Sequence, residues 1–178
     1  MTRSPGHSVL AVGVDPLEGY VRTRTAHYDP SFVSADPSFV HAHITLLAPW
    51  LPDPTQDDLD VVARIAAEAP AFDTVLARIE TFPDGLIHLR ADPDRPLRTL
   101  TRSLTAAFPQ CPPYRGEFGD VVPHLTLDRV ADGITPETVA ADLGGVLPVR
   151  LRVDRIDLQW WENHNCHVRE SWKLTGGR

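Results

Sequence analysis

The sequence predicts an α+β or mixed α/β fold made of two similar halves. Short apolar or alternating runs, which are typical of strands, are interspersed with runs of helical periodicity along the 178 residues. The same string, His-x-Thr-Leu, occurs at 43–46 and again at 124–127, each time within an apolar run. This repetition indicates a duplication, in which each half supplies one such strand and at least one helix.

In the first quarter of the chain, the sequence predicts two strands with a weakly indicated helix between them. Residues 9–14 form an apolar run ended by an Asp-Pro pair, which is typical of a buried strand. Residues 17–28 have a weak helical pattern, and 29–40, with two further Asp-Pro pairs, predict a loop. Residues 44–47 predict a second strand, which we expect Pro49 to stop.

The middle of the chain predicts a hairpin flanked by two helices. Apolar residues of 55–69 recur on one helical stripe, and Thr55 fits the N-cap position in front of two aspartates. The runs 74–82 and 86–91 have strand character, and the Asp-Gly pair between them favours a hairpin turn. In 95–108 the leucines again recur at helical spacing.

The last third of the chain predicts a motif strand, a helix and two further strands. We expect a loop at 109–123, the motif strand at 124–130 and a helix at 136–147, with proline at its first position. The alternating run 149–161 predicts one long strand, and 168–174 predicts the last one.

Composition and charge restrict the classes of protein. With 42% hydrophobic and 23% charged residues, the chain has the composition of a globular protein, and its length predicts a single domain over 1–178. Its net charge of −7, without a basic run, argues against binding of long duplex nucleic acid. No apolar run approaches the ~18 residues of a membrane span, and the first residues lack the apolar region of a signal peptide. We therefore expect a cytoplasmic protein without membrane contact.

The two His-x-Thr strings carry the predicted chemistry. Residues i and i+2 of a strand point to the same face, so His43 lies beside Thr45 and His124 beside Thr126. If the halves are related by a pseudo-two-fold axis, both pairs face one cavity. Near neutral pH one imidazole can accept a proton while the other donates one, and threonine hydroxyls can donate hydrogen bonds to phosphate oxygens. These are the groups needed to open a cyclic phosphodiester without a metal.

The segments around these strings resemble a known family. His43-Ile-Thr-Leu-Leu-Ala-Pro-Trp50 and Pro123-His-Leu-Thr-Leu-Asp-Arg129 are similar to the motifs of the two-histidine (2H) phosphoesterase superfamily, and within it to the 2'-5' RNA ligase and cyclic nucleotide phosphodiesterase group. The resemblance implies a bilobal, pseudo-two-fold α+β fold, with two antiparallel sheets around a V-shaped cleft and helices packed outside. It also implies hydrolysis of 2',3'-cyclic phosphates to 2'-phosphates, or related 2'-5' chemistry, without a cofactor.

Roles for single residues follow from the same resemblance. It implies that His43 protonates the 3'-oxygen and that His124 activates water, although the substrate can exchange the two roles. It places a phosphate-contacting arginine at Arg129. Because Arg129 is five residues after His124, an ideal strand would turn it to the opposite face, so a β-bulge or a strand end is needed there.

Other side chains near the motifs have less specific interpretations. Tyr114 and Trp161 are candidates for stacking on a nucleobase, although simple packing is the more common role of such aromatics. His41 alternates in phase with His43 and either flanks the cleft or is solvated, the second being the usual fate of a histidine at a strand start.

A metal site is not expected. The histidines and the cysteine at 164, 166 and 167 do not have a standard metal-ligand spacing, and the stretch favours a polar hairpin. The two cysteines of the chain, Cys111 and Cys166, predict neither a disulfide framework nor a zinc ribbon.

Three functions remain open from the sequence. The first is a metal-independent phosphodiesterase, with possible 2'-5' RNA ligase activity, that acts as a monomer on a small cyclic-phosphate nucleotide or an RNA terminus. The second is a module that binds a nucleotide or an RNA end in the same cleft without turnover. The third is an interaction domain with accidental motifs, which predicts histidines that lie far apart.

Overall fold

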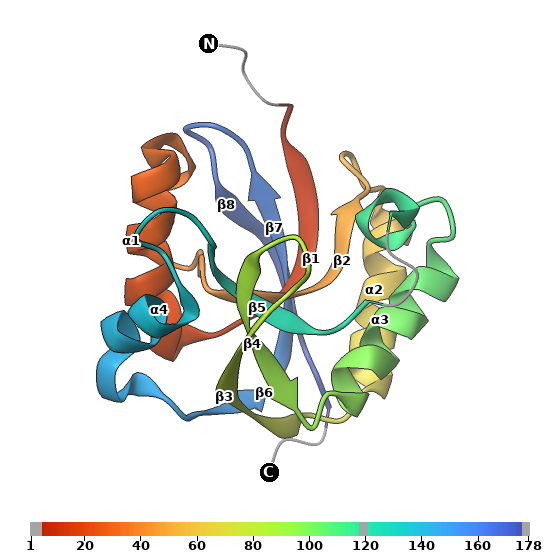
Figure 1. Cartoon of the computed structure of the whole chain (residues 1–178). Coiled ribbons are helices and arrows are strands. Elements are labelled where there is room, and N and C mark those ends of the chain that lie inside the picture. The colour runs from red at the N-terminus through yellow and green to blue at the C-terminus, as the bar shows by residue number, and fades with distance from the viewer. Residues whose placement is uncertain (1–4, 118–120, 176–178) are drawn as a thin grey trace.

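The computed structural model describes residues 5–117 and 121–175. Within these residues, eight strands form one strongly curved antiparallel sheet in the order β6-β3-β4-β5-β2-β1-β7-β8, accompanied by four α-helices (Figure 1). The strands are β1 (His7–Gly13), β2 (His43–Trp50), β3 (Phe72–Thr81), β4 (Leu86–Asp92), β5 (His124–Arg129), β6 (Val149–Val153), β7 (Arg155–Trp161) and β8 (His167–Lys173). The helices are α1 (Glu18–Tyr28), α2 (Gln56–Glu68), α3 (Arg95–Ala107) and α4 (Pro136–Leu143), and a 3-10 turn, η3, covers Pro113–Gly116.

The sheet consists of two halves of four strands each, which confirms the predicted duplicated α+β fold. One half is β6-β3-β4-β5 and the other is β2-β1-β7-β8. They are joined by a single backbone pair, Ile44 opposite Leu125, and both side chains are fully buried. The two antiparallel sheets are therefore continuous through the two motif strands, and the sheet bends at this junction.

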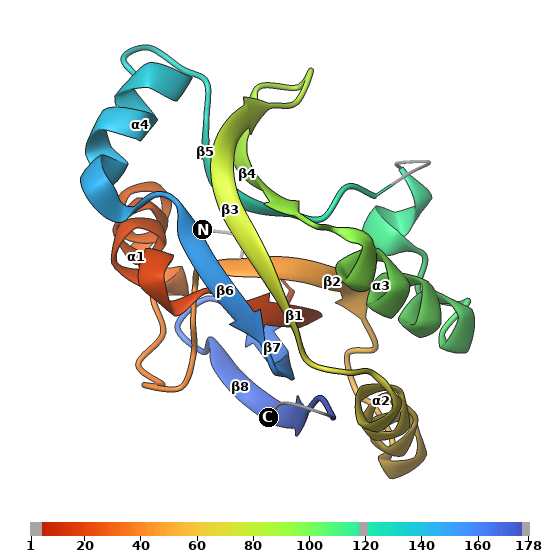
Figure 2. The ribbon, with the colours of Figure 1, turned by 90° about the horizontal axis from the view of Figure 1, so that it is seen from below.

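The helices show the same two-fold relation. Helix α1 connects β1 to β2 but packs against β5, and α3 connects β4 to β5 but packs against β2. Each of these two helices thus connects strands of one half of the sheet but packs against the other half. Helices α1 and α4 lie at one side of the sheet and α2 and α3 at the other, as both views show (Figure 2).

Local sequence signals account for the helix starts and the hairpin. Thr55 caps α2 in a capping box, in which its hydroxyl accepts from the Asp58 N–H and the Asp58 carboxylate accepts from the Thr55 N–H. Gly85 has a φ of +89° in the turn between β3 and β4, a conformation that glycine adopts without strain. These features confirm the predicted helix and hairpin.

The predicted single strand over 149–161 is wrong. It divides into β6, which pairs with β3 in one half, and β7, which pairs with β1 in the other. Asp154 and Arg155 are both exposed, so the alternation of buried and exposed residues shifts its phase there. That phase shift lets the chain cross from one half of the sheet to the other.

The prediction that Pro49 stops the second strand is also wrong. Strand β2 continues to Trp50, which pairs with Ser8 of β1. The register between β1 and β2 shifts twice near this point, and such irregularities accommodate a residue that cannot donate a ladder hydrogen bond.

A continuous apolar core connects the two halves. It includes Leu10 from β1, Leu76 from β3, Leu104 from α3 and the buried junction pair. Over residues 5–117 and 121–175, no helix combines the length and the hydropathy needed to cross a bilayer.

Candidate active site

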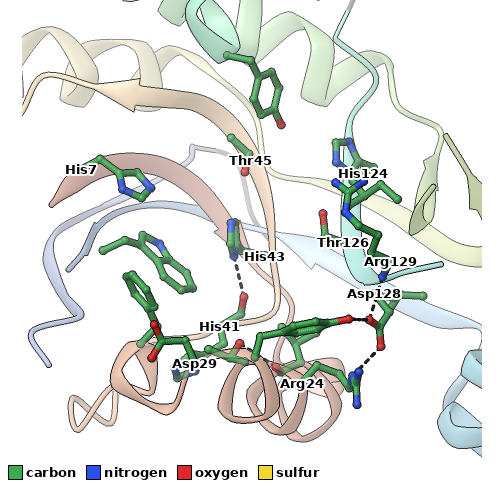
Figure 3. A pocket seen from close by; sticks show the side chains of 18 residues that line it. His7, Arg24, Asp29, His41, His43, Thr45, His124, Thr126, Asp128 and Arg129 are labelled. Atoms are coloured by element: carbon green, nitrogen blue, oxygen red, sulfur yellow. Dashed lines mark hydrogen bonds and ion pairs between the residues drawn. The ribbon is translucent and has the colours of Figure 1, made fainter. Parts of the chain in front are cut away.

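A cavity of about 660 Å³ lies where the motif strands of the two halves meet (Figure 3). Its wall comes from β1, α1, β2, η3, β5 and the end of β7, so both halves contribute. All seven residues that the sequence predicts for the site line this cavity: His43, Thr45, Tyr114, His124, Thr126, Arg129 and Trp161.

The junction between the halves explains why the two motifs share the cavity. Ile44 and Leu125, the residues that follow the two histidines, are direct partners in an antiparallel pair. In such a pair, their neighbours also stand opposite one another, so the register sets Thr45 against His124 and His43 against Thr126. Because the junction pair points into the core, the neighbours point to the other face, which is the cavity.

The two histidines are held by the same backbone device. His43 Nδ1 lies 2.7 Å from the carbonyl oxygen of His41, and His124 Nδ1 lies 2.7 Å from the carbonyl oxygen of Val122. Because a carbonyl only accepts, each Nδ1 must carry a proton. In the neutral ring Nε2 is then the unprotonated nitrogen, which can accept a proton from a ligand in the cavity.

Burial lowers the pKa of both rings below the usual histidine value. For His43, burial is the main cause, and the charges of His124 and His41 act in the same direction. For His124, burial is again the main cause, and the charge of His88 adds to it. Both rings line the same cavity, and the charge of His124 is one of the causes that lower the pKa of His43.

The two threonines have different surroundings in the cavity. Thr45 forms a side-chain hydrogen bond with Tyr114, whose pKa is raised by burial in spite of that bond. Tyr114 has a φ of +50° within η3, so the backbone is bent sharply where its ring enters the cavity. Thr126 is exposed on the cavity face of β5.

Arg129 reaches the cavity through a β-bulge. The pairing of β4 with β5 shifts between Thr126 and Asp128, which inserts one extra residue into β5. This insertion reverses the alternation and turns Arg129 to the cavity face, as the sequence required. Its guanidinium donates a hydrogen bond of 2.7 Å to the Asp84 carbonyl oxygen, and 54% of its side chain is exposed.

Trp161 belongs to an aromatic cluster beside His43. Its ring centroid lies 5.5 Å from that of His43 and 4.9 Å from that of Phe39. The indole N–H donates to the Gln159 side chain, which in turn donates to the Val40 carbonyl oxygen. The ring is thus fixed at the His43 end of the cavity and remains partly exposed there.

Sequence reasoning missed the contribution of helix α1. Arg24 and Tyr28 line the cavity, and both bind the Asp128 carboxylate: Arg24 Nε lies 2.6 Å from Oδ2, and the Tyr28 hydroxyl donates to Oδ1. None of the residues of α1, all of which the structure describes, is buried. The only signal in the sequence was the weak apolar periodicity of 17–28. It is weak because the inner face of this helix lines a cavity and buries no residue in the core.

The expectation that His41 is solvated is wrong. Its side chain is 1% exposed, and Nδ1 lies 2.6 Å from a Glu18 carboxylate oxygen. The Ser34 N–H donates to its Nε2, so both ring nitrogens of His41 have hydrogen-bond partners. The other Glu18 oxygen accepts from the Ala42 N–H. Helix α1 covers the strand start, which the sequence pattern did not reveal.

The described residues hold no group of three or more His, Cys, Asp or Glu side chains placed to bind a metal ion. The stretch 162–166 forms a polar connection between β7 and β8. Its backbone contacts the loop before β2, with the His164 N–H donating to the Ser31 carbonyl oxygen and the Ser34 hydroxyl donating to the Cys166 carbonyl oxygen.

The sequence matches the family model of the 2'-5' RNA ligase superfamily over residues 12–165. The chain belongs to the 2'-5' RNA ligase superfamily. The matched region includes both His-x-Thr strings and the cavity wall from β2 to the end of β7. Members of this superfamily are phosphoesterase- and ligase-type enzymes, which places the chain in the 2H phosphoesterase group that its motifs indicate.

Solved structures of this superfamily fold share the architecture at low identity. Escherichia coli LigT in complex with 3'-AMP is 17% identical, with a TM-score of 0.59 over 97% of this chain and all of LigT. TT0787 of Thermus thermophilus is 20% identical, with a TM-score of 0.57 over 97% of this chain and all of TT0787. LigT has also been solved in complex with NADP+ and with ATP. No curated protein matches this sequence.

Proposed function

We propose that this protein is a metal-independent phosphodiesterase that opens the 2',3'-cyclic phosphate of a nucleotide or an RNA end to a 2'-phosphate. The observation that supports it most strongly is the pair of imidazoles, each fixed through Nδ1, in one cavity built from both halves. That arrangement supplies one proton acceptor and one proton donor around a single phosphoryl group, and no metal is needed to activate the water.

The proposed reaction uses one neutral and one protonated ring. His124 Nε2 accepts a proton from water as the water oxygen bonds to phosphorus. The bond between phosphorus and the 3'-oxygen breaks, and protonated His43 gives its Nε2 proton to that oxygen. The product carries a 2'-phosphate and a 3'-hydroxyl, and the two rings have exchanged charge, so proton exchange with solvent restores the starting state.

The surroundings of the rings support this assignment of roles. The Glu18 charge favours the protonated form of His43, against the larger effect of burial, and the Trp161 ring packs beside it with centroids 5.5 Å apart. On the other side, the charge of His88 disfavours the protonated form of His124. If an RNA hydroxyl replaces water as the nucleophile, the same two groups support 2'-5' ligation.

The remaining site residues have binding roles in this proposal. The hydroxyls of Thr45 and Thr126 donate hydrogen bonds to the non-bridging phosphate oxygens, where negative charge develops. Arg129 supplies a half-exposed positive charge at the rim. Tyr114 and Trp161 offer aromatic surfaces at two ends of the cavity for a nucleobase.

The test is turnover of a panel of 2',3'-cyclic nucleotides with a chelator present, with products identified by phosphorus NMR. We expect 2'-phosphates as the only products and activity unaffected by the chelator. Because the pKa of both histidines is lowered, kcat/KM should have a bell-shaped pH dependence with its maximum below about pH 6.5. Binding of the nucleotides without turnover would contradict the proposal and favour a binding module.

A further inference from the structure

A second histidine lies directly behind His124. His88 is on β4, paired with Thr126 of β5, and its side chain is 1% exposed. Its ring stacks on Phe82 with centroids 3.7 Å apart and planes at 15°, and it meets the His124 ring edge-on at 5.3 Å. Phe82 also contacts His124 edge-on, at 4.9 Å. His124 is therefore packed against a two-ring stack.

The hydrogen bonds of His88 are incomplete. Nδ1 lies 3.2 Å from the Leu86 carbonyl oxygen and so carries a proton. Nε2 is buried and has no hydrogen-bond partner among the described residues, and the nearest charged atom is a Glu80 carboxylate oxygen, 3.8 Å away. A neutral ring leaves this nitrogen unsatisfied, whereas a protonated ring has two donors, one facing a carbonyl and one facing a carboxylate.

The charged groups around the pair come from three elements. Glu80 on β3 faces His88, and Arg90 on β4 lies 3.9 Å from the same Glu80 oxygen. Asp84, in the turn between β3 and β4, raises the pKa of His124 through its charge and also binds Arg129. Glu80 is thus the carboxylate that faces His88, and His88 is the ionisable ring that packs against His124.

We propose that His88, backed by Glu80, is a positioning residue that keeps the His124 ring oriented and in its neutral, proton-accepting form. The inference rests on the proposed function, since it explains how His124 stays ready to activate water. The ring contact restricts the tilt of His124 about its Nδ1 hydrogen bond. A charge on His88 opposes a second charge on His124, because like charges about 5 Å apart in a buried site repel one another.

The decisive variant is His88→Phe, which retains an aromatic ring between Phe82 and His124 but removes the charge. We expect the His124 titration followed by NMR to move to higher pH by about half a unit. The acidic side of the kcat/KM profile should move to higher pH by the same amount. At a fixed pH on that side, kcat/KM should therefore be roughly 3-fold lower than in the native protein. Glu80→Gln should shift the profile in the native background and should have no effect in the His88→Phe background.

The matched control is His167→Phe. His167 makes the same kind of bond, from Nδ1 to the carbonyl oxygen two residues earlier, at 2.9 Å, but it lies on β8 and does not line the cavity. We expect no shift in this variant. If His88→Phe does not fold, His88→Tyr, which also keeps an aromatic ring and lacks the charge, provides the comparison.

Three outcomes separate the possibilities. Superimposable His124 titrations in the native protein and in His88→Phe would overturn the inference, and so would a loss of activity without a shift in pH dependence, because packing alone would then explain His88. The NMR titration needs no turnover. If His88→Phe moves it while no cyclic phosphate is hydrolysed, the coupling is established and the proposed function fails.

Discussion

The two motif strands present the same device in different surroundings. On β2 and on β5, a histidine is fixed by the carbonyl oxygen two residues earlier, and a threonine follows on the same face. Each of these histidines also has a second histidine near it, but His41 precedes β2 and lines the cavity, whereas His88 lies on the neighbouring strand β4. The second histidine of the β2 side, His41, has both nitrogens bonded, and Glu18 is 2.6 Å away. That of the β5 side, His88, has one unsatisfied nitrogen, and Glu80 is 3.8 Å away.

This difference teaches that the two halves share the backbone geometry of the motif but not the residues that surround it. The fully bonded His41 supports the backbone to which His43 binds, and its charge also contributes to the lowered pKa of His43. An incompletely bonded His88 can take up charge, so its effect on His124 is electrostatic as well. The two imidazoles therefore have different charged neighbours, and acid–base catalysis by a pair requires groups whose surroundings separate their pKa values.

The largest expected effect is the loss of activity when either site histidine is removed, and it tests whether both motif strands are needed for catalysis. We expect His43→Ala and His124→Ala each to lower kcat/KM for a 2',3'-cyclic nucleotide by about 10²–10⁴-fold, because each removes a proton-transfer group. The double variant should be little worse than either single one, since the two rings act as a unit. Steady-state kinetics provide the measurement.

His27→Ala is the control for these variants. His27 is exposed on α1 and does not line the cavity. We expect native activity from it, and native circular dichroism from all variants. Full activity in either His43→Ala or His124→Ala would contradict the two-histidine mechanism, because the histidine of one motif strand would then be dispensable.

The next largest expected effect concerns Glu18, whose hydrogen bonds hold the chain segment before β2. Burial opposes ionisation of Glu18, but its hydrogen bonds with His41 and Ala42 lower its pKa overall. A carboxylate with a lowered pKa stabilises the fold above its unfolded pKa, and this stabilisation is lost as the pH falls through the folded value. Glu18→Gln should therefore destabilise the protein by about 1–2 kcal/mol at pH 7 and by much less near pH 3, measured by urea unfolding.

Glu68→Gln, at the exposed end of α2, is the matched carboxylate variant and should have little effect at either pH. Glu18→Gln should move the pH–rate profile less than His88→Phe does. An equal or larger shift would show that charge acts at least as strongly on the β2 side, and the proposed contrast between the sides would be lost.

The smallest effect concerns the cavity rim. Arg129 is half exposed and already bonded to Asp84, so its attraction for a phosphate is screened by water and by that carboxylate. We expect Arg129→Ala to raise KM by about 3–10-fold with little change in kcat. Arg22→Ala, an exposed α1 residue outside the cavity wall, should leave KM unchanged. A loss confined to kcat would instead assign Arg129 to the transition state.

Much of the site could be predicted from local sequence. The period of a strand places His43 with Thr45 and His124 with Thr126 whatever the rest of the fold does. The need for a bulge before Arg129 follows from the same period, and the structure has that bulge. The long strand over 149–161 was predicted wrongly because alternation describes a strand but does not say which neighbour it pairs with.

The sequence by itself determined which side chains share a face, since that depends on backbone geometry over two or three residues. Only the tertiary structure decided that Ile44 meets Leu125, that α1 brings Arg24 and Tyr28 into the cavity wall, and that His88 packs against His124. These contacts join residues far apart in the chain, and they depend on how the sheet bends and which helix covers it. Periodicity carries no information about either.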